Sequence, residues 1–186
     1  ELVNKTPISA PLLTGAWADL GTGSGAIALG LAQAFPQATI HATDISHKAI
    51  AIAQHNARRN KLTKHISFHR GSWLEPLCMC RKKLSGIITN PPYIPSKTIL
   101  TLEPEVVDHE PHLALDGGPD GLDYIKTLIA KSTDYLTANS IWLTELMAGQ
   151  AQLVAALVED CKRYNNIAIH SDLSGIDRFV SARKAL

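Results

Sequence analysis

Cysteine and excess charge are scarce in this sequence of 186 residues. The three cysteines, Cys78, Cys80 and Cys161, are an odd number without a C-x-x-C pair, so the sequence indicates neither a disulfide framework nor a zinc ribbon. A reducing cytoplasm fits this pattern best. Lys and Arg together number 18 against 17 for Asp and Glu, a net charge of +1. Proteins that bind duplex nucleic acid usually display a basic stripe, which this balance disfavours.

Long apolar runs are absent too. No stretch approaches the roughly 20 residues that cross a bilayer, and the opening ELVNKTPISAP lacks the basic start and apolar core of a signal peptide. We therefore expect a soluble protein with no membrane contact. The sequence does not begin with Met, which leads us to expect a further N-terminal portion. His109 and His112 approach helical ligand spacing, but Pro111 disfavours a helix there, and we expect no metal.

Hydrophobic residues make up 45% of the chain, and its length suits one domain with a substantial core. Short β-rich runs alternate with longer helical patterns, which predicts an α/β fold with a mostly parallel sheet covered by helices. The expected strands are 16–21, 39–44, 66–71, 84–89, 140–146, 166–172 and 178–184, and the expected helices are 24–35, 46–60, 122–137 and 149–163.

Local signals refine this prediction at three places. Ser46 is expected to be the N-cap of its helix. The short link SGID (174–177) between the last two strands predicts an antiparallel hairpin at a sheet edge. The helix expected at 149–163 carries an apolar stripe that we expect to face the core, formed by Leu153, Leu157, Val158 and Cys161.

A glycine-rich loop follows the first expected strand. In DLGTGSGA (19–26), Gly21, Gly23 and Ala26 satisfy the G-x-G-x-x-G/A pattern, in which glycines let the backbone approach a ligand at a helix N-terminus. Asp44 ends the second strand, where a carboxylate can accept hydrogen bonds from ribose hydroxyls. These features fit a nicotinamide dinucleotide and S-adenosylmethionine equally, so the loop alone does not choose between them.

A second motif, TNPPYIP (89–95), follows the apolar strand LSGII. Amide and exocyclic amine nitrogens are poor nucleophiles because their lone pair is delocalised, so transfer to them requires acceptors that hold both N–H protons. The Asn90 side chain and the Pro91 main chain each supply a carbonyl, and two prolines make the turn rigid. The ring of Tyr93 can pack flat on a planar amide or base. This turn predicts transfer of a group to such a nitrogen.

Together these motifs resemble a class I S-adenosylmethionine-dependent methyltransferase with an N-P-P-Y turn, and more narrowly the HemK/PrmC family of release factor glutamine methyltransferases. The narrower resemblance rests on DLGTGSGAIAL, GSWLEPL, TNPPYIP, HEPHLALDGGPDGLDY and DLSGIDRFVSAR, which span nearly the whole chain. It implies a Rossmann-like seven-stranded sheet with an antiparallel edge hairpin, and a single catalytic domain over 1–186. We expect the small N-terminal helical domain usual in the family to be absent from this sequence.

The resemblance also implies an activity. This is methyl transfer from S-adenosylmethionine, leaving S-adenosylhomocysteine, to the glutamine amide of the Gly-Gly-Gln motif in peptide chain release factors. It implies that the glycines approach the methionine part of the cofactor, that Asp44 binds its ribose and that Trp73 packs near its adenine. The full cofactor-binding set is Asp19, Gly21, Thr22, Gly23, Gly25, Asp44, Ile45, Ser72, Trp73 and Asn90.

For the substrate, the resemblance implies that Asn90, Pro91 and Tyr93 receive the glutamine amide, and these are the catalytic residues that we predict. The expected substrate-binding set adds Pro92, Glu110 and Pro111. Three alternatives stay open: methylation of an exocyclic amine in RNA or DNA, a non-catalytic cofactor-binding or docking protein, and nicotinamide oxidoreduction. Weak net basicity disfavours methylation of nucleic acid. The intact Asn-Pro-Pro-Tyr turn disfavours a non-catalytic protein, and the lack of an evident acid partner for a substrate carbonyl disfavours oxidoreduction.

Overall fold

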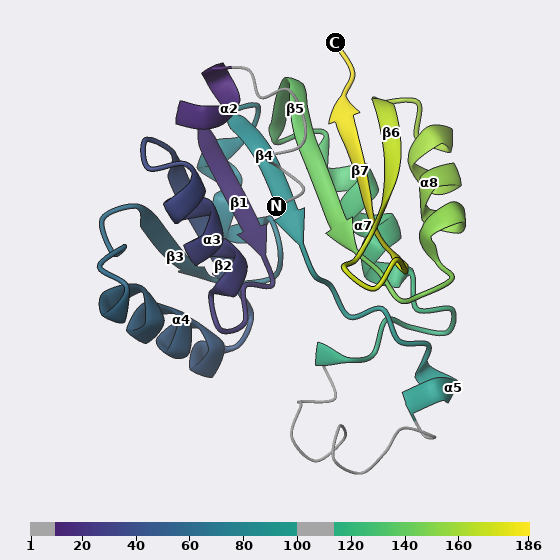
Figure 1. Cartoon of the computed structure of the whole chain (residues 1–186), viewed down its shortest axis with the longest axis horizontal. Coiled ribbons are helices and arrows are strands. Elements are labelled where there is room, and N and C mark those ends of the chain that lie inside the picture. Colours follow the sequence, from purple (N-terminus) through teal and green to yellow (C-terminus); the bar gives the residue numbers. More distant parts are fainter. Residues whose placement is uncertain (1–9, 100–113) are drawn as a thin grey trace.

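The computed structural model describes residues 10–99 and 114–186. Within these ranges seven strands form one sheet in the order β3-β2-β1-β4-β5-β7-β6 (Figure 1). The strands are β1 Ala16–Leu20, β2 Thr39–Asp44, β3 Ile66–Arg70, β4 Leu84–Thr89, β5 Leu136–Glu145, β6 Tyr164–Ser171 and β7 Asp177–Lys184. Strands β1 to β5 pair in parallel, whereas β7 pairs antiparallel with both β5 and β6. The predicted α/β fold and edge hairpin are confirmed.

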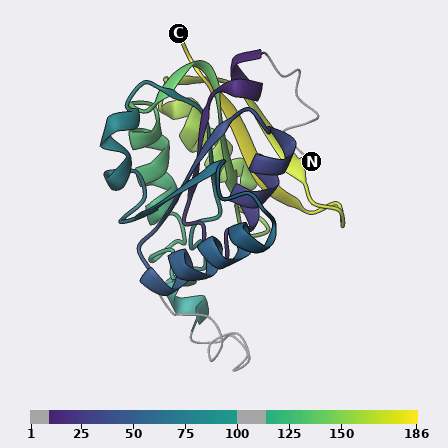
Figure 2. The ribbon, with the colours of Figure 1, turned by 90° about the vertical axis from the view of Figure 1, so that its left-hand side faces the viewer.

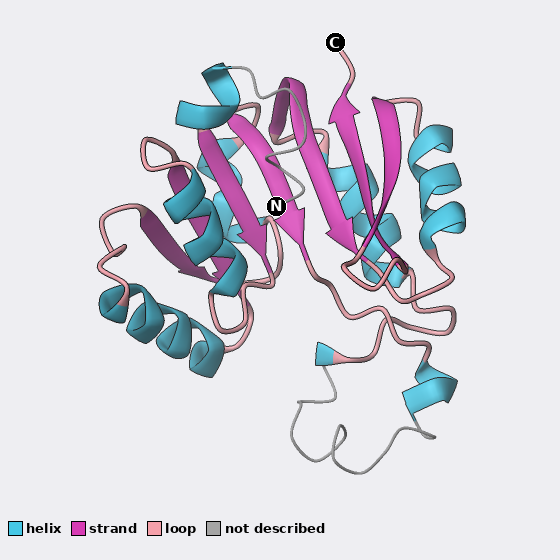
Figure 3. Cartoon of the chain, in the orientation of Figure 1, coloured by secondary structure: helices cyan, strands magenta, loops and turns pink. Residues whose placement is uncertain are grey.

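Helices cover both faces of this sheet (Figures 2 and 3). Residues of α2 (Ala10–Thr14), α3 (Ala26–Ala34) and α4 (His47–Arg59) pack in one hydrophobic cluster. Residues of the 3-10 helix η1 (Glu75–Cys80), α7 (Asp123–Ser132) and α8 (Ala151–Asp160) pack in a second cluster. The short helix α5 (Ser96–Ile99) follows the Asn-Pro-Pro-Tyr turn. None of the helices in the described ranges is long and apolar enough to cross a membrane.

Alternating side chains of the central strands fill the two clusters. Trp17 belongs to the cluster beneath α3, and its neighbour Ala18 belongs to the opposite one. Ile87 and Ile88 of β4 divide in the same way, as the two-residue period of a strand requires. Strand β4 is buried along its whole length, so its carboxyl end is held firmly between its neighbours.

The indole of Trp17 explains a glycine in the middle of β4. A Cβ atom at Gly86 would lie 2.2 Å from two ring carbons of Trp17, so only glycine leaves room for the ring. Trp17 also stacks on Phe35 with 5.3 Å between ring centroids, and its Nε1 donates to the carbonyl of Leu12 at 2.8 Å. This packing fixes β1 against β4, the two strands that carry the predicted motifs.

Several expected boundaries agree with the structure, whereas the end of the helix expected over 122–137 and the start of the strand expected over 140–146 do not. Ser46 is the N-cap of α4, and its hydroxyl accepts from the N–H of Ala49 at 3.3 Å. The helix expected over 122–137 is too long, because α7 ends at Ser132 and β5 already begins at Leu136. The apolar residues after Ser132 continue the helical period without a glycine or proline to end it.

The stripe expected on α8 is confirmed except at Leu153. Val158 is buried, and the partly buried Leu157 and Cys161 pack against the core, whereas Leu153 is 54% exposed. The buried residues of the helix also include Ala151 and Val154, because this face must meet β6, β7 and α7.

Candidate active site

The carboxyl ends of the five parallel strands lie along one edge of the sheet. Leu20 is in register with Thr43 of β2 and with Thr89 of β4, and Thr89 is in register with Thr144 of β5. The Thr89 hydroxyl donates to the carbonyl of Leu20 at 2.9 Å, which ties the ends of β1 and β4 together. The glycine loop and the Asn-Pro-Pro-Tyr turn therefore begin side by side.

The glycine loop is fastened to the end of β2. The N–H groups of Gly21 and Thr22 both donate to the carbonyl of Thr43, at 2.9 and 2.8 Å. Gly21 and Gly23 have φ of 72° and 54°, a region that L side chains rarely adopt. No heavy atom lies within 4 Å of a Cβ built at Gly23, so the loop is open there. Gly25 is buried against Ala53 of α4, which gives this glycine a packing role.

Asp44 joins two segments of main chain at the end of β2. Its Oδ2 accepts from the N–H of Gly23 at 2.9 Å, and its Oδ1 accepts from the N–H of Ser46 at 2.8 Å. Because each carboxylate oxygen has two lone pairs, both oxygens keep the capacity to accept another donor. The side chain is partly exposed, so a ligand hydroxyl can reach it.

Asp19 lies beneath the loop and is fully buried. Its Oδ2 accepts from the Thr22 hydroxyl at 2.5 Å and from the N–H of Ala28 at 3.0 Å, so this oxygen fixes the loop onto the first turn of α3. Its Oδ1 has no partner. Burial raises the pKa of Asp19 to about 6, although the hydrogen bonds from Thr22 and Ala28 oppose the change. The negative charge of Asp44 makes a smaller contribution to this increase in pKa.

Three more predicted residues lie beyond β2 and β3. Ile45 is 54% exposed, and its carbonyl accepts from Nε of Arg70 at 3.4 Å. Ser72 and Trp73 are partly exposed. A Cβ at Gly21 would lie 3.1 Å from Cζ3 of Trp73, so the indole packs directly against the glycine loop. The ring also contacts Tyr124, with 5.3 Å between ring centroids.

The Asn-Pro-Pro-Tyr turn meets the glycine loop near Gly21. Asn90 is exposed although it directly follows a fully buried strand, and its main-chain oxygen lies 4.0 Å from the Cβ position of Gly21. Pro91 is buried, whereas Pro92 and Tyr93 are partly exposed. The structure thus brings Gly21, Trp73 and Asn90 together. The remaining predicted substrate residues, Glu110 and Pro111, lie outside the described residues.

The first residues of the second described range, 114–121, brace the Asn-Pro-Pro-Tyr turn. Ile94 forms a parallel bridge with Asp116: its N–H donates to the carbonyl of Leu115 at 3.1 Å, and its carbonyl accepts from Gly117 at 2.9 Å. A Cβ at Gly117 would lie 2.8 Å from the carbonyl oxygen of Pro92. The main chain of the LDGGPDG motif therefore packs tightly on the Asn-Pro-Pro-Tyr turn. This contact accounts for Gly117 and Gly121, whereas a Cβ at Gly118 would meet the side chain of Asp123.

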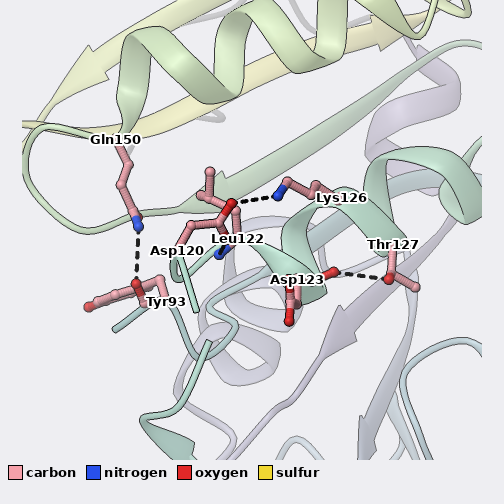
Figure 4. A network of polar contacts seen from close by, with 7 residues as sticks. All are labelled: Tyr93, Asp120, Leu122, Asp123, Lys126, Thr127 and Gln150. Atoms are coloured by element: carbon pink, nitrogen blue, oxygen red, sulfur yellow. Dashed lines mark hydrogen bonds and ion pairs between the residues drawn. The ribbon is translucent and has the colours of Figure 1, made fainter. Parts of the chain in front are cut away.

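Two residues that the sequence analysis did not single out also contact the turn. Glu145 ends β5, and the side chain of Tyr93 lowers the pKa of its carboxyl group. Gln150 donates from Nε2 to the carbonyl of Tyr93 at 3.1 Å (Figure 4). The rule that parallel strands gather their carboxyl ends would have pointed to Glu145. No local signal marks Gln150. In the described ranges no group of three or more His, Cys, Asp or Glu side chains is arranged to hold a metal.

Curated proteins named "Release factor glutamine methyltransferase" are similar to this chain. The protein from Synechocystis sp. is 54% identical over 90% of this chain, and the one from Thermosynechococcus vestitus is 46% identical over 91%. The protein from Geobacter sulfurreducens is 37% identical over 98% of this chain. The alignments cover 56%, 58% and 61% of these relatives, so the chain spans little more than half of their length.

Solved structures share the fold at low sequence identity. A methyltransferase from Pyrococcus furiosus has a TM-score of 0.66 with 13% identity, covering 92% of this chain and 76% of that one. The ribosomal protein L11 methylase from Lactobacillus delbrueckii subsp. bulgaricus has a TM-score of 0.67 with 17% identity, covering 98% and 74%. The family model described as "Methyltransferase small domain" matches residues 2–118, more than half of the chain. This chain belongs to the methyltransferase small domain family.

Proposed function

We propose that residues 1–186 form a single catalytic domain of the HemK/PrmC type. This domain transfers a methyl group from S-adenosylmethionine to the side-chain amide nitrogen of the glutamine in the Gly-Gly-Gln motif of a peptide chain release factor. The names of the relatives support this substrate. The three free cysteines of this chain support a reducing compartment, the cytoplasm, as the location of the protein.

The loop residues fit the cofactor chemically. Gly23 leaves space that a side chain would fill, and Asp44 keeps acceptor capacity for ribose hydroxyls. Exposed Ile45 and the Trp73 indole offer apolar surface for adenine, with Ser72 beside them. Asp19 and Thr22 hold the loop in place, and the unpartnered Oδ1 of Asp19 adds an anionic group that favours a cationic ligand. When bound, S-adenosylmethionine supplies an electrophilic methyl group on a positively charged sulfur.

The observation that carries the proposal is the exposed amide of Asn90, held at the end of a buried strand beside the glycine loop. The carbonyls of the Asn90 side chain and of Pro91 accept the two N–H protons of the substrate amide. The ring of Tyr93 packs on the amide plane, and Pro92 keeps the turn rigid. These acceptors orient the nitrogen lone pair toward the methyl group, and their hydrogen bonds strengthen as positive charge develops on the nitrogen.

Proton balance needs no strong base in the site. As the new N–C bond forms, the S–C bond breaks, and the nitrogen then carries one proton too many. That proton is acidic and leaves to water, so the chain has to orient the amide and does not have to ionise it. Glu110 and Pro111 are proposed to shape the substrate side of this site.

The test is to locate the methyl group. The purified chain is incubated with isotope-labelled S-adenosylmethionine and either a release factor or total RNA, and Asn90→Ala serves as the control. We expect label on the release factor with the native chain and much less with the variant. Label on RNA in place of the release factor would support base methylation. Cofactor binding without any transfer would support a non-catalytic cofactor-binding or docking protein.

A further inference from the structure

The connection between β5 and α8 contacts the Asn-Pro-Pro-Tyr turn at Tyr93. Gln150, at the start of α8, is 7% exposed, and both polar atoms of its side chain are used. Its Nε2 donates to the carbonyl of Tyr93 at 3.1 Å, and its Oε1 accepts from the N–H of Met147 at 3.0 Å. Figure 4 shows the side chain extending from the end of its loop to the main chain of Tyr93. The amide therefore fixes the turn relative to its own loop.

The hydrogen bond of Gln150 is enclosed by main chain on its other side. A Cβ at Gly121 would lie 2.3 Å from the carbonyl oxygen of Tyr93 and 2.8 Å from Nε2 of Gln150. The buried main chain of Gly121 thus lies directly against this donor and acceptor. A hydrogen bond shielded from water in this way is costly to leave unmade, because neither group finds a replacement partner.

Glu145 interacts with the side chain of Tyr93. That side chain, whose one donor is its hydroxyl, lowers the pKa of the Glu145 carboxyl group. Glu145 is partly buried and pairs with Phe179 across β5 and β7. Burial raises its pKa, whereas the positive charge of Arg178 and the Tyr93 side chain lower it. Glu145 therefore acts on the side chain of Tyr93, whereas Gln150 binds its main-chain carbonyl.

We propose that Glu145 and Gln150 are positioning residues that act through Tyr93 and set the geometry of the Asn-Pro-Pro-Tyr turn for the substrate amide. This inference rests on the proposed function. Neither side chain has to touch the substrate. Gln150 fixes the main chain three residues after Asn90, and Glu145 fixes the ring that packs on the amide.

The variants separate the two contacts. Gln150→Leu removes the donor, and Gln150→Glu keeps the acceptor for Met147 but cannot donate to Tyr93 at neutral pH. Glu145→Leu removes the acceptor for the hydroxyl, whereas Glu145→Gln keeps one. Matched controls are Gln152→Leu and Glu159→Leu, which change exposed residues of α8. Assays run well below the lowest melting temperature of the set, so that every variant compared is folded.

Misplacing a reacting group by about 1 Å can cost about a hundredfold in rate. We therefore expect both Gln150 variants and Glu145→Leu to lower kcat/KM by roughly 10- to 100-fold, with KM for the release factor raised. Glu145→Gln should recover most of the loss, and the controls should match the native chain. Calorimetry should find S-adenosylhomocysteine affinity within about twofold throughout, because Tyr93 lies on the substrate side. A parallel loss of cofactor affinity would overturn the positioning role in favour of a general structural one.

A spectroscopic measurement tests the contact between Glu145 and Tyr93 independently of activity. The chain has four tyrosines, which are labelled with ¹³C at Cζ, and the Tyr93 signal is assigned with Tyr93→Phe. Glu145→Leu should shift that signal and Glu159→Leu should leave it in place. An unchanged signal in Glu145→Leu would overturn the proposal. If the native chain methylates no release factor, the proposed function fails. The spectrum and the binding data still decide whether Glu145 and Gln150 position Tyr93.

Discussion

The carboxylate of Asp44 accepts a hydrogen bond of 2.9 Å from the main-chain N–H of Gly23, so the end of β2 holds the centre of the glycine loop. Its other oxygen accepts from Ser46 at the start of α4. A residue expected to bind a ribose therefore also preorganises the loop that receives the rest of the cofactor. Loss of this carboxylate should weaken cofactor binding in both ways.

Asp44→Ala is expected to weaken S-adenosylhomocysteine binding by about 1.5–3 kcal/mol, because a charged acceptor is lost. Asp44→Asn keeps one acceptor oxygen and should lose less. Isothermal titration calorimetry measures both, with Asp160→Ala on the exposed end of α8 as the control. Equal affinity in Asp44→Ala and the native chain would mean that the ribose is held elsewhere.

Gly21→Ala should lower both stability and cofactor affinity. The residue has φ of 72°, and the added methyl group would lie 3.1 Å from the Trp73 ring. A left-handed conformation costs a non-glycine residue about 1–2 kcal/mol, and displacement of the indole adds to that. Thermal unfolding with and without S-adenosylhomocysteine measures the two effects.

The matched control for this change is Gly30→Ala, in α3 with open space around its Cβ position. It should raise stability by roughly 0.5–1 kcal/mol, because alanine favours a helix. A Gly21→Ala variant as stable as the native chain would contradict the close packing of Trp73 on the loop.

The carboxyl group of Asp19 should make stability depend on pH in a defined direction. Burial raises its pKa to about 6 from an ordinary value of 3.8, so the folded state binds the proton more tightly than the unfolded state does. Its contribution to stability is fully present below about pH 4 and is lost as pH rises through about 6. The full effect is on the order of 2–3 kcal/mol, because a tenfold difference in proton affinity between the folded and unfolded states corresponds to about 1.36 kcal/mol.

Asp19→Asn cannot titrate at this position. The free energy of unfolding of the native chain minus that of the variant should therefore fall between about pH 4 and pH 6 and stay level above that range. Urea unfolding at a series of pH values measures this difference, in which the titration of all other groups cancels. A difference that rises with pH would show that Asp19 is stabilised as a carboxylate.

Asn90→Ala should lower kcat by about 10²–10³, as removal of one hydrogen-bonding group from a transition state does, with cofactor affinity almost unchanged. Single-turnover assays and calorimetry measure the two quantities. Asn165→Ala, an exposed change at the start of edge strand β6, is the control. Unchanged turnover in Asn90→Ala would remove this side chain from the mechanism.

Local patterns predicted those parts of the fold that local chemistry determines. Strand β2 has the expected bounds, because apolar residues alternate between Thr39 and Asp44, and α4 has the expected cap. The end of α7 was misplaced, because the turn at Thr133 is closed by its hydroxyl donating to the carbonyl of Ala130 and contains no glycine or proline. The exposure of Leu153 on α8 depends on neighbouring elements that the sequence of the helix does not specify.

The residues of the candidate site likewise divide into those that a local sequence signal marks and those that only the assembled fold brings together. Glycine spacing, a carboxylate at a strand end and two prolines after an asparagine are signals within a few residues, and the structure places Gly21, Asp44 and Asn90 at one edge of the sheet. The hydrogen bond from Gln150 to Tyr93 joins residues 57 positions apart, and the bridge between Ile94 and Asp116 crosses the gap in the described chain. Such contacts follow from the assembled fold, so the sequence alone could not predict them.

The most direct test of the account is to map the transferred methyl group on a release factor by tandem mass spectrometry after incubation with this chain and S-adenosylmethionine. The account predicts one added methyl group on the side-chain nitrogen of the glutamine in the Gly-Gly-Gln motif, and none when that glutamine is replaced by glutamate. A methyl group on another residue of the release factor, or on the glutamate of the replaced motif, would contradict it.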